Sequence, residues 1–354
     1  MRSFLAARLL SDKMRLGIHR LIATCFLIIG MAAGAMACTL PPDLRTDVPP
    51  GGLDVPTQVT SSFAIVDFMG VDDENQQIEV DFFLNLRWKD PRLLQNEGCR
   101  FAITKVWFPR IRMLNSQALR VAYKNSQNQV SVHQDGMVEY VQRFTGPISS
   151  YHNLSDFPFD HHEFTIDFVA VEETNNLIHF IADENNTWIS DRLNIEGWDL
   201  GDPRLEVTTH SFQKQAGLSL QKLSLLIDGD RNPEFYLYRL ICLLALVVAM
   251  SWVIFWVPPS RFEFQIGIGA TTMLTAMAFI FAIGSQLPPV GYLTKLDKMV
   301  IWSIVLIFLS IVDALVAGRI VLNGREPEAL RLDSVSRFSF PALLIGGWTI
   351  IVQG

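Results

Sequence analysis

Residues 261–298 read RFEFQIGIGATTMLTAMAFIFAIGSQLPPVGYLTKLDK, and this stretch decides the architecture of the chain. From Phe264 to Leu287 it is long and apolar enough to cross the hydrocarbon core of a bilayer, which takes about 20 residues. Wound at about 3.6 residues per turn, it nevertheless places an acid and several small or hydroxyl side chains on one stripe. The members of this stripe are Glu263, Gly267, Thr271, Leu274, Ala278, Phe281 and Ser285.

The stripe has two interpretations. A carboxylate at a membrane face is costly unless it meets water, so several copies around an axis would turn the stripe into a pore. The pore would begin with a charged ring at Glu263, continue with a hydroxyl ring at Thr271 and narrow at hydrophobic constrictions that can gate by dewetting. Alternatively, the small residues allow this helix to pack closely against neighbouring membrane helices.

The composition divides the chain into a polar half and an apolar half. The 354 residues are 49% apolar and 18% charged, but apolar runs dominate only from residue 234 onward. We therefore expect a water-exposed domain followed by a membrane domain. The net charge of −7 and the lack of a basic stripe argue against a nucleic-acid partner.

Residues 1–37 predict a secretory signal peptide. Basic residues precede the apolar run 21–33, and Ala35-Met36-Ala37 forms a small-x-small cleavage site. Cleavage would leave Cys38 as the first residue of the mature chain. Lipid attachment at Cys38 is one possibility, and a disulfide with Cys99, the other cysteine on the exported side, is another.

The exported part, residues 38–232, predicts an all-β sandwich. Gln77–Asp90 alternates apolar and polar residues with the period of two that is typical of a half-buried strand. Clusters of Gly, Asn and Asp interrupt the chain at regular intervals, and no long amphipathic helix intervenes. Further strands are expected at 121–123, 138–144, 163–168, 178–181, 205–212 and 218–227.

The apolar part, residues 233–354, predicts a bundle of four transmembrane helices. We expect them at about 234–257, 262–287, 297–318 and 337–353. A short polar linker, Arg319 to Arg337, is expected between the third and the fourth helix. Basic residues are concentrated in this linker, so the positive-inside rule puts it in the cytoplasm and the sandwich outside.

Three local sequences together resemble one family. They are LRWKDPRL at 86–93, YHNLSDFPFDHHEF at 151–164 and RNPEFYLYRLICLLALVVAMSW at 231–252. They resemble the pentameric ligand-gated ion channels of the Cys-loop receptor superfamily, and in particular the bacterial, amine-gated members. The resemblance implies a homopentamer without enzymatic activity or cofactor, in the inner membrane of a bacterium, with the sandwich in the periplasm.

The resemblance also assigns roles to residues. It implies that Glu263 forms a ring selecting monovalent cations, and that Leu274 and Phe281 form the constrictions of the pore. It implies a coupling zone between sandwich and membrane made of Asp72, Asp73, Phe157, Pro158, Phe159, Asp160, Arg231 and Pro288. The disulfide of the animal receptors is missing, since Ser150 and Phe164 stand at its positions.

The agonist is less well defined. The family binds amines between subunits with aromatic side chains, through cation–π contacts. The candidates here are Trp88, Tyr140, Val171, His210 and Phe212. Because the loop 169–171 offers no aromatic residue and the hairpin loop 210–217 offers only Phe212, we expect a small-molecule agonist, an amine or a proton, without naming it. His210 could sense protons or could simply be an exposed loop histidine.

Several short motifs have two interpretations. His161-His162-Glu163 suggests a metal site, but neighbouring strand residues point to opposite faces, so a solvated loop is expected. The acidic turn 72–74 could bind a divalent cation or be a solvated hairpin tip. The motif Trp88-x-Asp90-x-Arg92 is expected to stabilise the fold. Cys242-Leu243-Leu244 replaces a family proline, so a kink should be lost.

Two other functional classes were compared with the channel. An enzyme would be expected to carry a nucleophile elbow, a phosphate-binding glycine loop or a zinc motif, and the sequence has none of these. A membrane-anchored pentameric sensor that binds a ligand but conducts little is the closer alternative. Four membrane segments and a polar stripe favour the channel.

Overall fold

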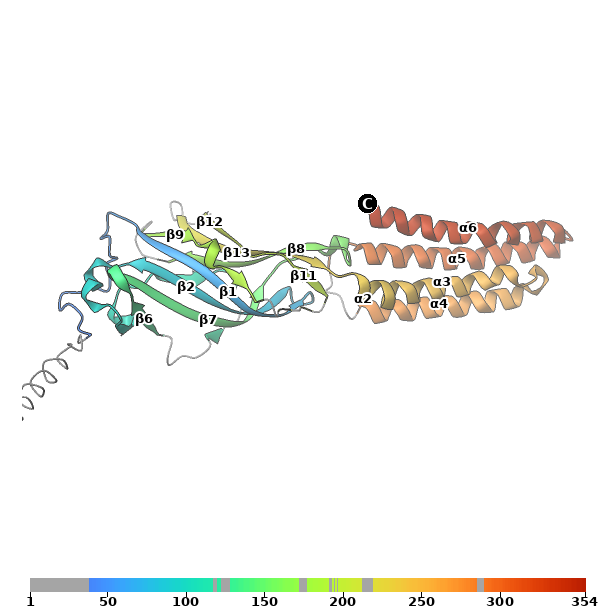
Figure 1. Ribbon diagram of the computed structural model, residues 1–354. Coiled ribbons are helices and arrows are strands. Elements are labelled where there is room, and N and C mark those ends of the chain that lie inside the picture. The colour runs from blue at the N-terminus through green and yellow to red at the C-terminus, as the bar shows by residue number, and fades with distance from the viewer. Residues whose placement is uncertain are drawn as a thin grey trace, which may run out of the picture.

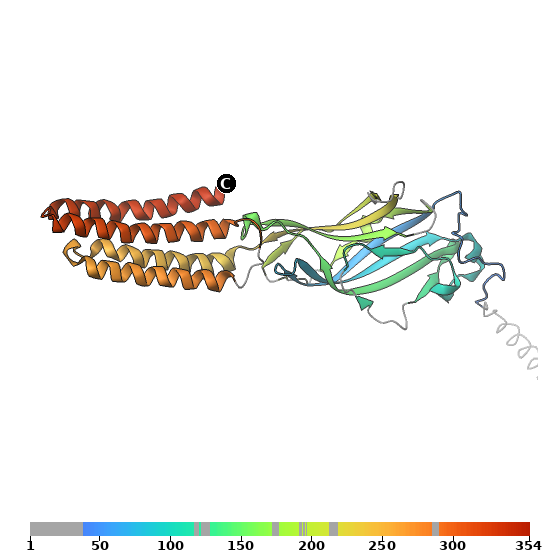
Figure 2. The same cartoon turned by 180° about the vertical axis from the view of Figure 1, so that it is seen from behind.

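The computed structural model describes residues 38–116, 120–121, 128–171, 177–190, 193, 195, 197–211, 219–284 and 290–354. The molecule is elongated, with a β-sandwich at one end and a bundle of long helices at the other (Figures 1 and 2). The signal peptide expected at residues 1–37 lies outside the described residues.

Two sheets form the sandwich. The strands are β1 (Thr57–Asp72), β2 (Gln77–Lys89), β3 (Arg100–Ala102), β4 (Ile111–Met113), β5 (Arg120–Val121), β6 (Gln129–Val132), β7 (Met137–Ser149), β8 (His161–Ala170), β9 (Ile178–Ala182), β10 (Trp188–Ile189), β11 (Trp198–Leu200), β12 (Arg204–Ser211) and β13 (Ser219–Arg231). One sheet has the order β10-β1-β2-β7-β6-β3, with β9 also beside β1 and β5 beside β7. The other has the order β11-β13-β8-β4, with β12 beside β13.

The strand register gathers distant segments at the end of the sandwich that faces the helices. In the β1–β2 hairpin, Asp72 is opposite Gln77, which puts the turn 73–76 at this end. Gln77 is in turn opposite Ser149 at the end of β7. In the second sheet, the end of β13 pairs with the start of β8, where Asp230 is opposite His161.

The interior of the sandwich follows the alternation predicted for β2. Every second side chain of this strand, from Ile78 to Trp88, is buried. Phe63, Phe82 and Phe168 meet across the two sheets with ring centroids 5.9–6.3 Å apart. Full burial of each such ring stabilises the fold by about 1.5–3 kcal/mol, so this layer holds the two sheets together.

The motif around Trp88 is structural. Trp88 is only 1% exposed and packs edge-on against Trp107, at 5.8 Å between centroids. Asp90 accepts two hydrogen bonds of 2.8 Å from the guanidinium of Arg92 and one from its backbone N–H. Trp88 therefore lies in the core, and its assignment to a ligand site is corrected.

The segment before β1 is attached to the sandwich by a disulfide between Cys38 and Cys99. Its Cα atoms are 5.6 Å apart, and Cys99 is buried just before β3. Of the two possibilities for Cys38, the structure has the disulfide. Lipid attachment would need a free thiol, which this bond uses.

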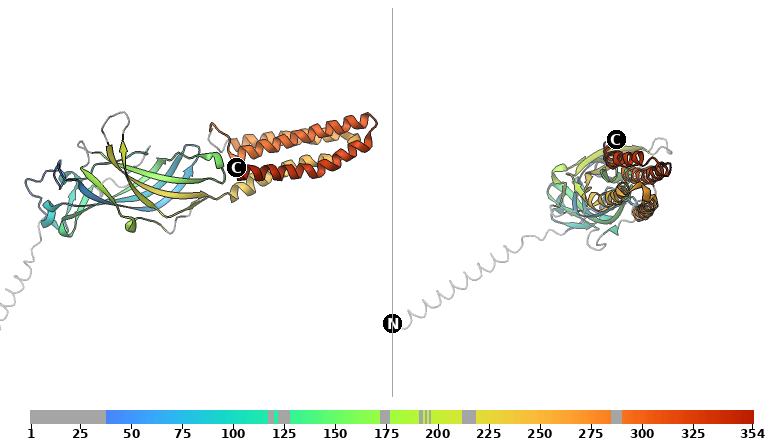
Figure 3. Two further views of the ribbon diagram at one scale, coloured as in Figure 1. Left: turned by 90° about the horizontal axis from the view of Figure 1, so that it is seen from above. Right: turned by 90° about the vertical axis from the view of Figure 1, so that its right-hand side faces the viewer.

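The helices are α2 (Glu234–Tyr236), α3 (Cys242–Trp252), α4 (Phe262–Gly284), α5 (Lys295–Leu322) and α6 (Glu326–Gln353). Within the described residues, four helical segments are long and apolar enough to cross a membrane: 234–256, 259–281, 295–322 and 326–353. They run side by side, and the end-on view in Figure 3 shows them as one bundle.

The prediction of a polar linker at Arg319–Arg337 is wrong, because most of this region is helical. Helix α5 continues to Leu322 and α6 begins at Glu326, so only a tight turn at Gly324, which has a φ of +76°, separates them. The many charged residues of this region make its helical spacing hard to recognise in the sequence. Four residues recur at helical spacing and are buried against the bundle: Ala329, Asp333, Ser336 and Phe340.

The first membrane helix is irregular although its proline is missing. Between α2 and α3, residues Leu237–Ile241 form a π-helical turn. Such a turn inserts one extra residue into the helix and is frequent at functional sites. Residues Cys242–Trp252, where the family proline is replaced, form the regular helix α3, and the irregular turn lies before them, directly below the sandwich.

The role of Asp90 can be tested by Asp90→Ala. The change leaves the Arg92 guanidinium without its carboxylate, so we expect the free energy of unfolding to fall by about 2–3 kcal/mol. The measurement is the melting temperature (Tm) of the full-length protein. Arg45→Gln breaks the exposed Arg45–Asp47 pair and should leave Tm unchanged; equal losses in both variants would contradict the assignment.

Candidate functional site

A buried arginine joins the sandwich to the helices. Arg231 ends β13 and is 6% exposed. Its Nε donates a hydrogen bond of 2.9 Å to Asp160 Oδ1, and its two terminal nitrogens each lie 2.9 Å from an oxygen of Asp73. Asp73 belongs to the β1–β2 turn and Asp160 precedes β8. We call this Asp73–Arg231–Asp160 group the arginine clamp.

Aromatic rings surround the clamp. The guanidinium carbon of Arg231 lies 4.3 Å from the centroid of Trp198 and 4.9 Å from that of Phe157. Tyr236 of α2 lies 5.9 Å away and approaches Arg231 with its hydroxyl, at 3.4 Å. Cation–π contacts of this kind are strongest where water is excluded, and the Tyr236 contact extends the clamp to the first membrane helix.

The electrostatics of the clamp favour its charged form. Burial alone would raise the pKa of Asp73 and of Asp160. Contacts with His152 and His162, together with the hydrogen bonds and charge of Arg231, outweigh burial, so both pKa values lie below their usual range. Burial would likewise lower the pKa of Arg231, but the two carboxylates raise it above its ordinary value.

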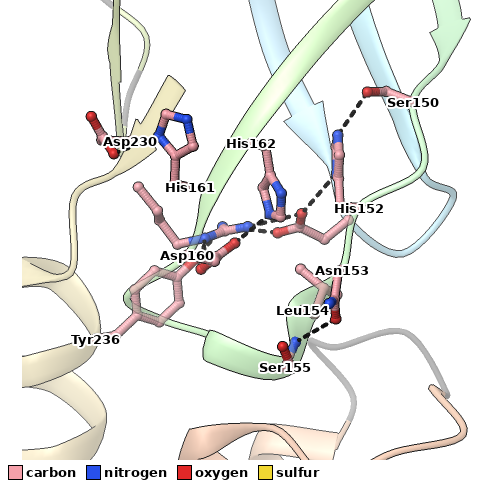
Figure 4. A network of polar contacts seen from close by, with 12 residues as sticks. Ser150, His152, Asn153, Leu154, Ser155, Asp160, His161, His162, Asp230 and Tyr236 are labelled. Atoms are coloured by element: carbon pink, nitrogen blue, oxygen red, sulfur yellow. Dashed lines mark hydrogen bonds and ion pairs between the residues drawn. The ribbon is translucent and has the colours of Figure 1, made fainter. Parts of the chain in front are cut away.

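Two histidines lie next to the two carboxylates of the clamp (Figure 4). His162 Nε2 lies 2.6 Å from Asp160 Oδ2, and His152 Nε2 lies 2.7 Å from Ser150 Oγ. Nδ1 of His152 lies 3.7 Å from Asp73 Oδ1. The two imidazole rings stack, with centroids 4.5 Å apart and planes at 21°.

The position of His161 and His162 corrects the solvated loop expected there. Both belong to β8 and point to opposite faces: His161 is exposed beside Asp230, and His162 is 7% exposed. The opposite orientation that argued against joint metal binding is thus observed. Across the described part of the chain, no group of three His, Cys, Asp or Glu residues could hold a metal ion.

The acidic turn is only partly a solvated tip: Asp72 and Glu74 are exposed, whereas Asp73 is half-buried. Asp72 accepts hydrogen bonds from the backbone and side-chain nitrogens of Asn75, at 2.9 and 2.8 Å, and these bonds lower its pKa. Asp72 thereby shapes the turn, and Asp73 turns inward to Arg231. Pro288, the remaining member of the expected coupling zone, lies outside the described residues.

The loop before β8 rests on the membrane helices. Phe157 is buried with Ile241 and Leu296, and its carbonyl accepts a hydrogen bond of 3.1 Å from the Leu296 backbone N–H. Pro158 is buried beside it and Phe159 is half-buried. The backbone N–H of Leu154 donates to the Tyr292 hydroxyl at 2.8 Å, and Lys295 pairs with Asp156 at 3.1 Å.

Helix α4 has one buried and one exposed face. The buried face consists of Gln265, Gly269, Thr272 and Ala276. Each residue of the predicted stripe from Glu263 to Ala278 is two positions from one of these, which is about half a helical turn. The stripe is therefore exposed in the single subunit, with Leu274 at 72% and Phe281 at 80% exposure. Ser285 lies outside the described residues.

Among the described residues, the ligand candidates are spread over both sheets of the sandwich. Tyr140 is a buried residue of β7, where burial raises its pKa to about 12 and its hydroxyl donates to Gln142. Val171 follows β8 and His210 lies on β12, and both of these strands belong to the sheet that does not contain β7. Phe212 is outside the described residues. A hollow of about 630 Å³ opens elsewhere, between β10 and β11 beside Trp188.

The sequence missed part of this site. His152, Trp198 and Tyr236 all contact the clamp or its histidines, but the sequence analysis does not predict them as site residues. Tyr236 and His152 lie inside the quoted motifs, so their proximity to Arg231 and Asp160 was the available signal. Trp198 is remote in sequence and had no such signal.

The chain is thus a β-sandwich joined by charged loops to four helical segments that are long and apolar enough to cross a membrane. Residues 43–220, half of the chain, match the family model described as neurotransmitter-gated ion-channel ligand binding domain. The chain therefore belongs to the family of pentameric, Cys-loop ligand-gated ion channels. This confirms the resemblance at the level of the family, which is not a family of enzymes.

Individual relatives are distant. The chain is 23% identical to the proton-gated ion channel of Gloeobacter violaceus, over 84% of this chain and 83% of that one. It is 24% identical to the gamma-aminobutyric acid receptor subunit beta of Lymnaea stagnalis, over 77% of this chain. The similar subunit of Drosophila melanogaster is 22% identical, over 73% of this chain. The matches cover 57% and 55% of these two animal subunits.

Arg231→Lys tests the geometry of the clamp. Lysine keeps the positive charge but lacks the planar fork that bridges two carboxylates. We expect a loss of about 2–4 kcal/mol in the free energy of unfolding, visible as a lower Tm of the full-length protein. Arg204→Lys, at an exposed pairing with Asp228, is the matched control. A Tm of Arg231→Lys equal to that of the wild type would show that charge alone suffices.

Asp160→Asn tests the lowered pKa. A carboxylate with a depressed pKa contributes stability fully above its unfolded value of about 3.9 and loses it as the pH falls through the lowered folded value. The difference in Tm between wild type and Asp160→Asn should therefore persist at pH 5 and shrink below about pH 4. A difference that is unchanged at pH 3 would contradict the charged clamp.

Proposed function

We propose that the chain is the subunit of a homopentameric, cation-selective ligand-gated channel of a bacterial inner membrane, with the sandwich in the periplasm. The observation that carries this proposal is the exposed stripe of α4. Glu263 and Thr271 lie on a face that no other helix of the described subunit covers. An acid on an exposed face at membrane depth is costly in lipid, and a water-filled axis shared by five copies removes that cost.

In this pentamer, the stripe lines the pore. The members are Glu263, Gly267, Thr271, Leu274, Ala278, Phe281 and Ser285. Rings of Leu274 and Phe281 would form hydrophobic constrictions that close the pore by dewetting, and a ring of five Glu263 carboxylates would concentrate cations and repel anions. The buried opposite face, with Gln265 bonded to the carbonyls of Ile254 and Val257, supports a fixed orientation of α4.

The arginine clamp would transmit binding to the pore. A ligand opens a channel only if it binds the open and closed states with different affinity. Asp73, Asp160 and Arg231 connect both sheets to one point, and Phe157 and Tyr236 continue the contact to α5 and α2. A rearrangement of the sandwich therefore reaches the helices through charged and packed contacts rather than through a flexible linker.

The agonist would bind between the sandwiches of neighbouring subunits. Its class is a small molecule, with an amine or a proton as the two candidates. The segments RNPEFYLY, AMSWVIFW and PALLIGGW resemble the amine-gated channel of Erwinia, which favours an amine. The relative from Gloeobacter violaceus is named a proton-gated channel, which favours protons.

The pore assignment is tested by Leu274→Ser in the full-length protein, with currents recorded without added ligand. A hydroxyl at the constriction favours the wetted state, and we expect the resting current to rise by about tenfold, equivalent to about 1.4 kcal/mol in the gating equilibrium. Ile345→Ser, at a position of α6 that is 64% exposed, is the control and should not change the current.

Glu263→Gln tests selectivity in the same recordings. The reversal potential under a salt gradient should move toward zero, because the ring loses its charge while its size is kept. If pentamers at the surface pass no current in the wild type and in Leu274→Ser, the channel proposal fails. A pentameric sensor that binds a ligand without conducting would then take its place.

A further inference from the structure

We propose that the stacked pair His152 and His162 is a proton-binding site that regulates gating through the arginine clamp. The proposal rests on the channel function proposed above. It also assigns the binding of a proton to buried residues of the coupling zone, away from the interface between sandwiches. The argument uses the contacts of the two rings, the charges that face them and the segments to which they are connected.

Both rings are buried and each faces one carboxylate of the clamp. His152 is 6% and His162 is 7% exposed. His162 Nε2 lies 2.6 Å from Asp160 Oδ2, so this nitrogen carries the hydrogen toward the carboxylate. Nδ1 of His152 has no hydrogen-bond partner within the described residues, and the nearest acceptor is Asp73 Oδ1 at 3.7 Å.

The charges around the pair favour one added proton. Asp73 from the β1–β2 turn and Asp160 from the start of β8 are negative, and Arg231 from the end of β13 is positive. With neutral histidines, these three groups sum to one negative charge. The two rings also contact three uncharged residues: Ser150, Phe164 and Trp198. One proton therefore balances the site, whereas two imidazolium rings 4.5 Å apart would repel.

The geometry places this proton on His152. A neutral imidazole has one N–H, so it can donate to Ser150 or point its hydrogen at Asp73, but it cannot do both. A protonated ring donates from both nitrogens. The proton would then close the 3.7 Å gap to Asp73 Oδ1, which is the same oxygen that accepts from a terminal nitrogen of Arg231 at 2.9 Å.

Protonation of His152 would therefore act on the clamp and on the loop that follows it. His152 would become the second cation on Asp73 and would share that carboxylate with Arg231. It lies two residues before Leu154, whose backbone N–H donates to the Tyr292 hydroxyl ahead of α5. The proton thus adds a contact between the β1–β2 turn and the loop on the membrane helices. It shifts the gating equilibrium toward the state in which His152 contacts Asp73.

A histidine without a perturbing environment changes charge between pH 5 and 8, so this is the pH range of the test. The chain also offers a matched control for the removal of a histidine side chain. His161 is the sequence neighbour of His162 on β8, but it is exposed and pairs with Asp230. Glutamine keeps a hydrogen-bond donor near the Nε2 position and does not titrate. His152→Gln and His162→Gln therefore remove the proton site, and His161→Gln removes a histidine without touching it.

The experiment uses protons as the probe on the full-length channel in liposomes, with currents recorded while the external pH is stepped from 8 to 5. One linked proton changes the gating equilibrium by up to about tenfold per pH unit. We expect the wild type and His161→Gln to respond alike. His152→Gln should reduce the response by at least about threefold. An unchanged response in His152→Gln would overturn the proposal.

A second measurement separates the proton site from conduction. Because protonated His152 gains Asp73 as a partner, the Tm of the purified pentamer should rise between pH 8 and 5.5 in the wild type and in His161→Gln. It should rise less in His152→Gln and in His162→Gln. If these Tm changes are observed but the protein passes no current, the proton site is supported and the channel function is refuted. Equal rises in all four proteins would refute the proton site, whether or not the protein conducts.

Discussion

The structure depends on one buried positive charge. Arg231 needs both Asp73 and Asp160, because a guanidinium removed from water is stable only when its donors and its charge are matched. These partners come from the β1–β2 turn, the start of β8 and the end of β13, so the strand register must be correct in both sheets for the clamp to form. The sandwich and the helices are thus joined at a buried charged group whose members come from three separate segments.

The packing of the membrane helices adds a second constraint, because it determines which face of α4 is covered by other helices and which is not. The buried residues of α4 are Gln265, Gly269, Thr272 and Ala276, and they fix which side of the helix is left uncovered. The uncovered side combines an acid, small residues and two large apolar side chains. This combination suits neither lipid nor a dry helix contact along its whole length, but it suits a narrow aqueous axis.

Much of the fold was predictable because it has local periodic signals. The alternation in β2 and the apolar runs of α3 to α5 come directly from side-chain burial, and the FPFD motif located Asp160. The beginning of α6 was not predicted, because its charged residues masked the helical spacing of Ala329, Asp333 and Ser336. The partners of His152 and Trp198 were not predictable either, since strand register brings them to Arg231 from distant positions and leaves no periodic trace in the sequence.

The most direct test of the account is the accessibility of cysteines along α4 to a water-soluble, charged thiol reagent during current recording, in a Cys242→Ser background. Cysteines replacing Gly267, Thr271, Leu274 and Ala278 should be modified and should block the current, and those replacing Gln265, Gly269, Thr272 and Ala276 should not. This alternation would place the exposed face on the water-filled axis. Block that follows the buried face, or no block at any position, would contradict the account.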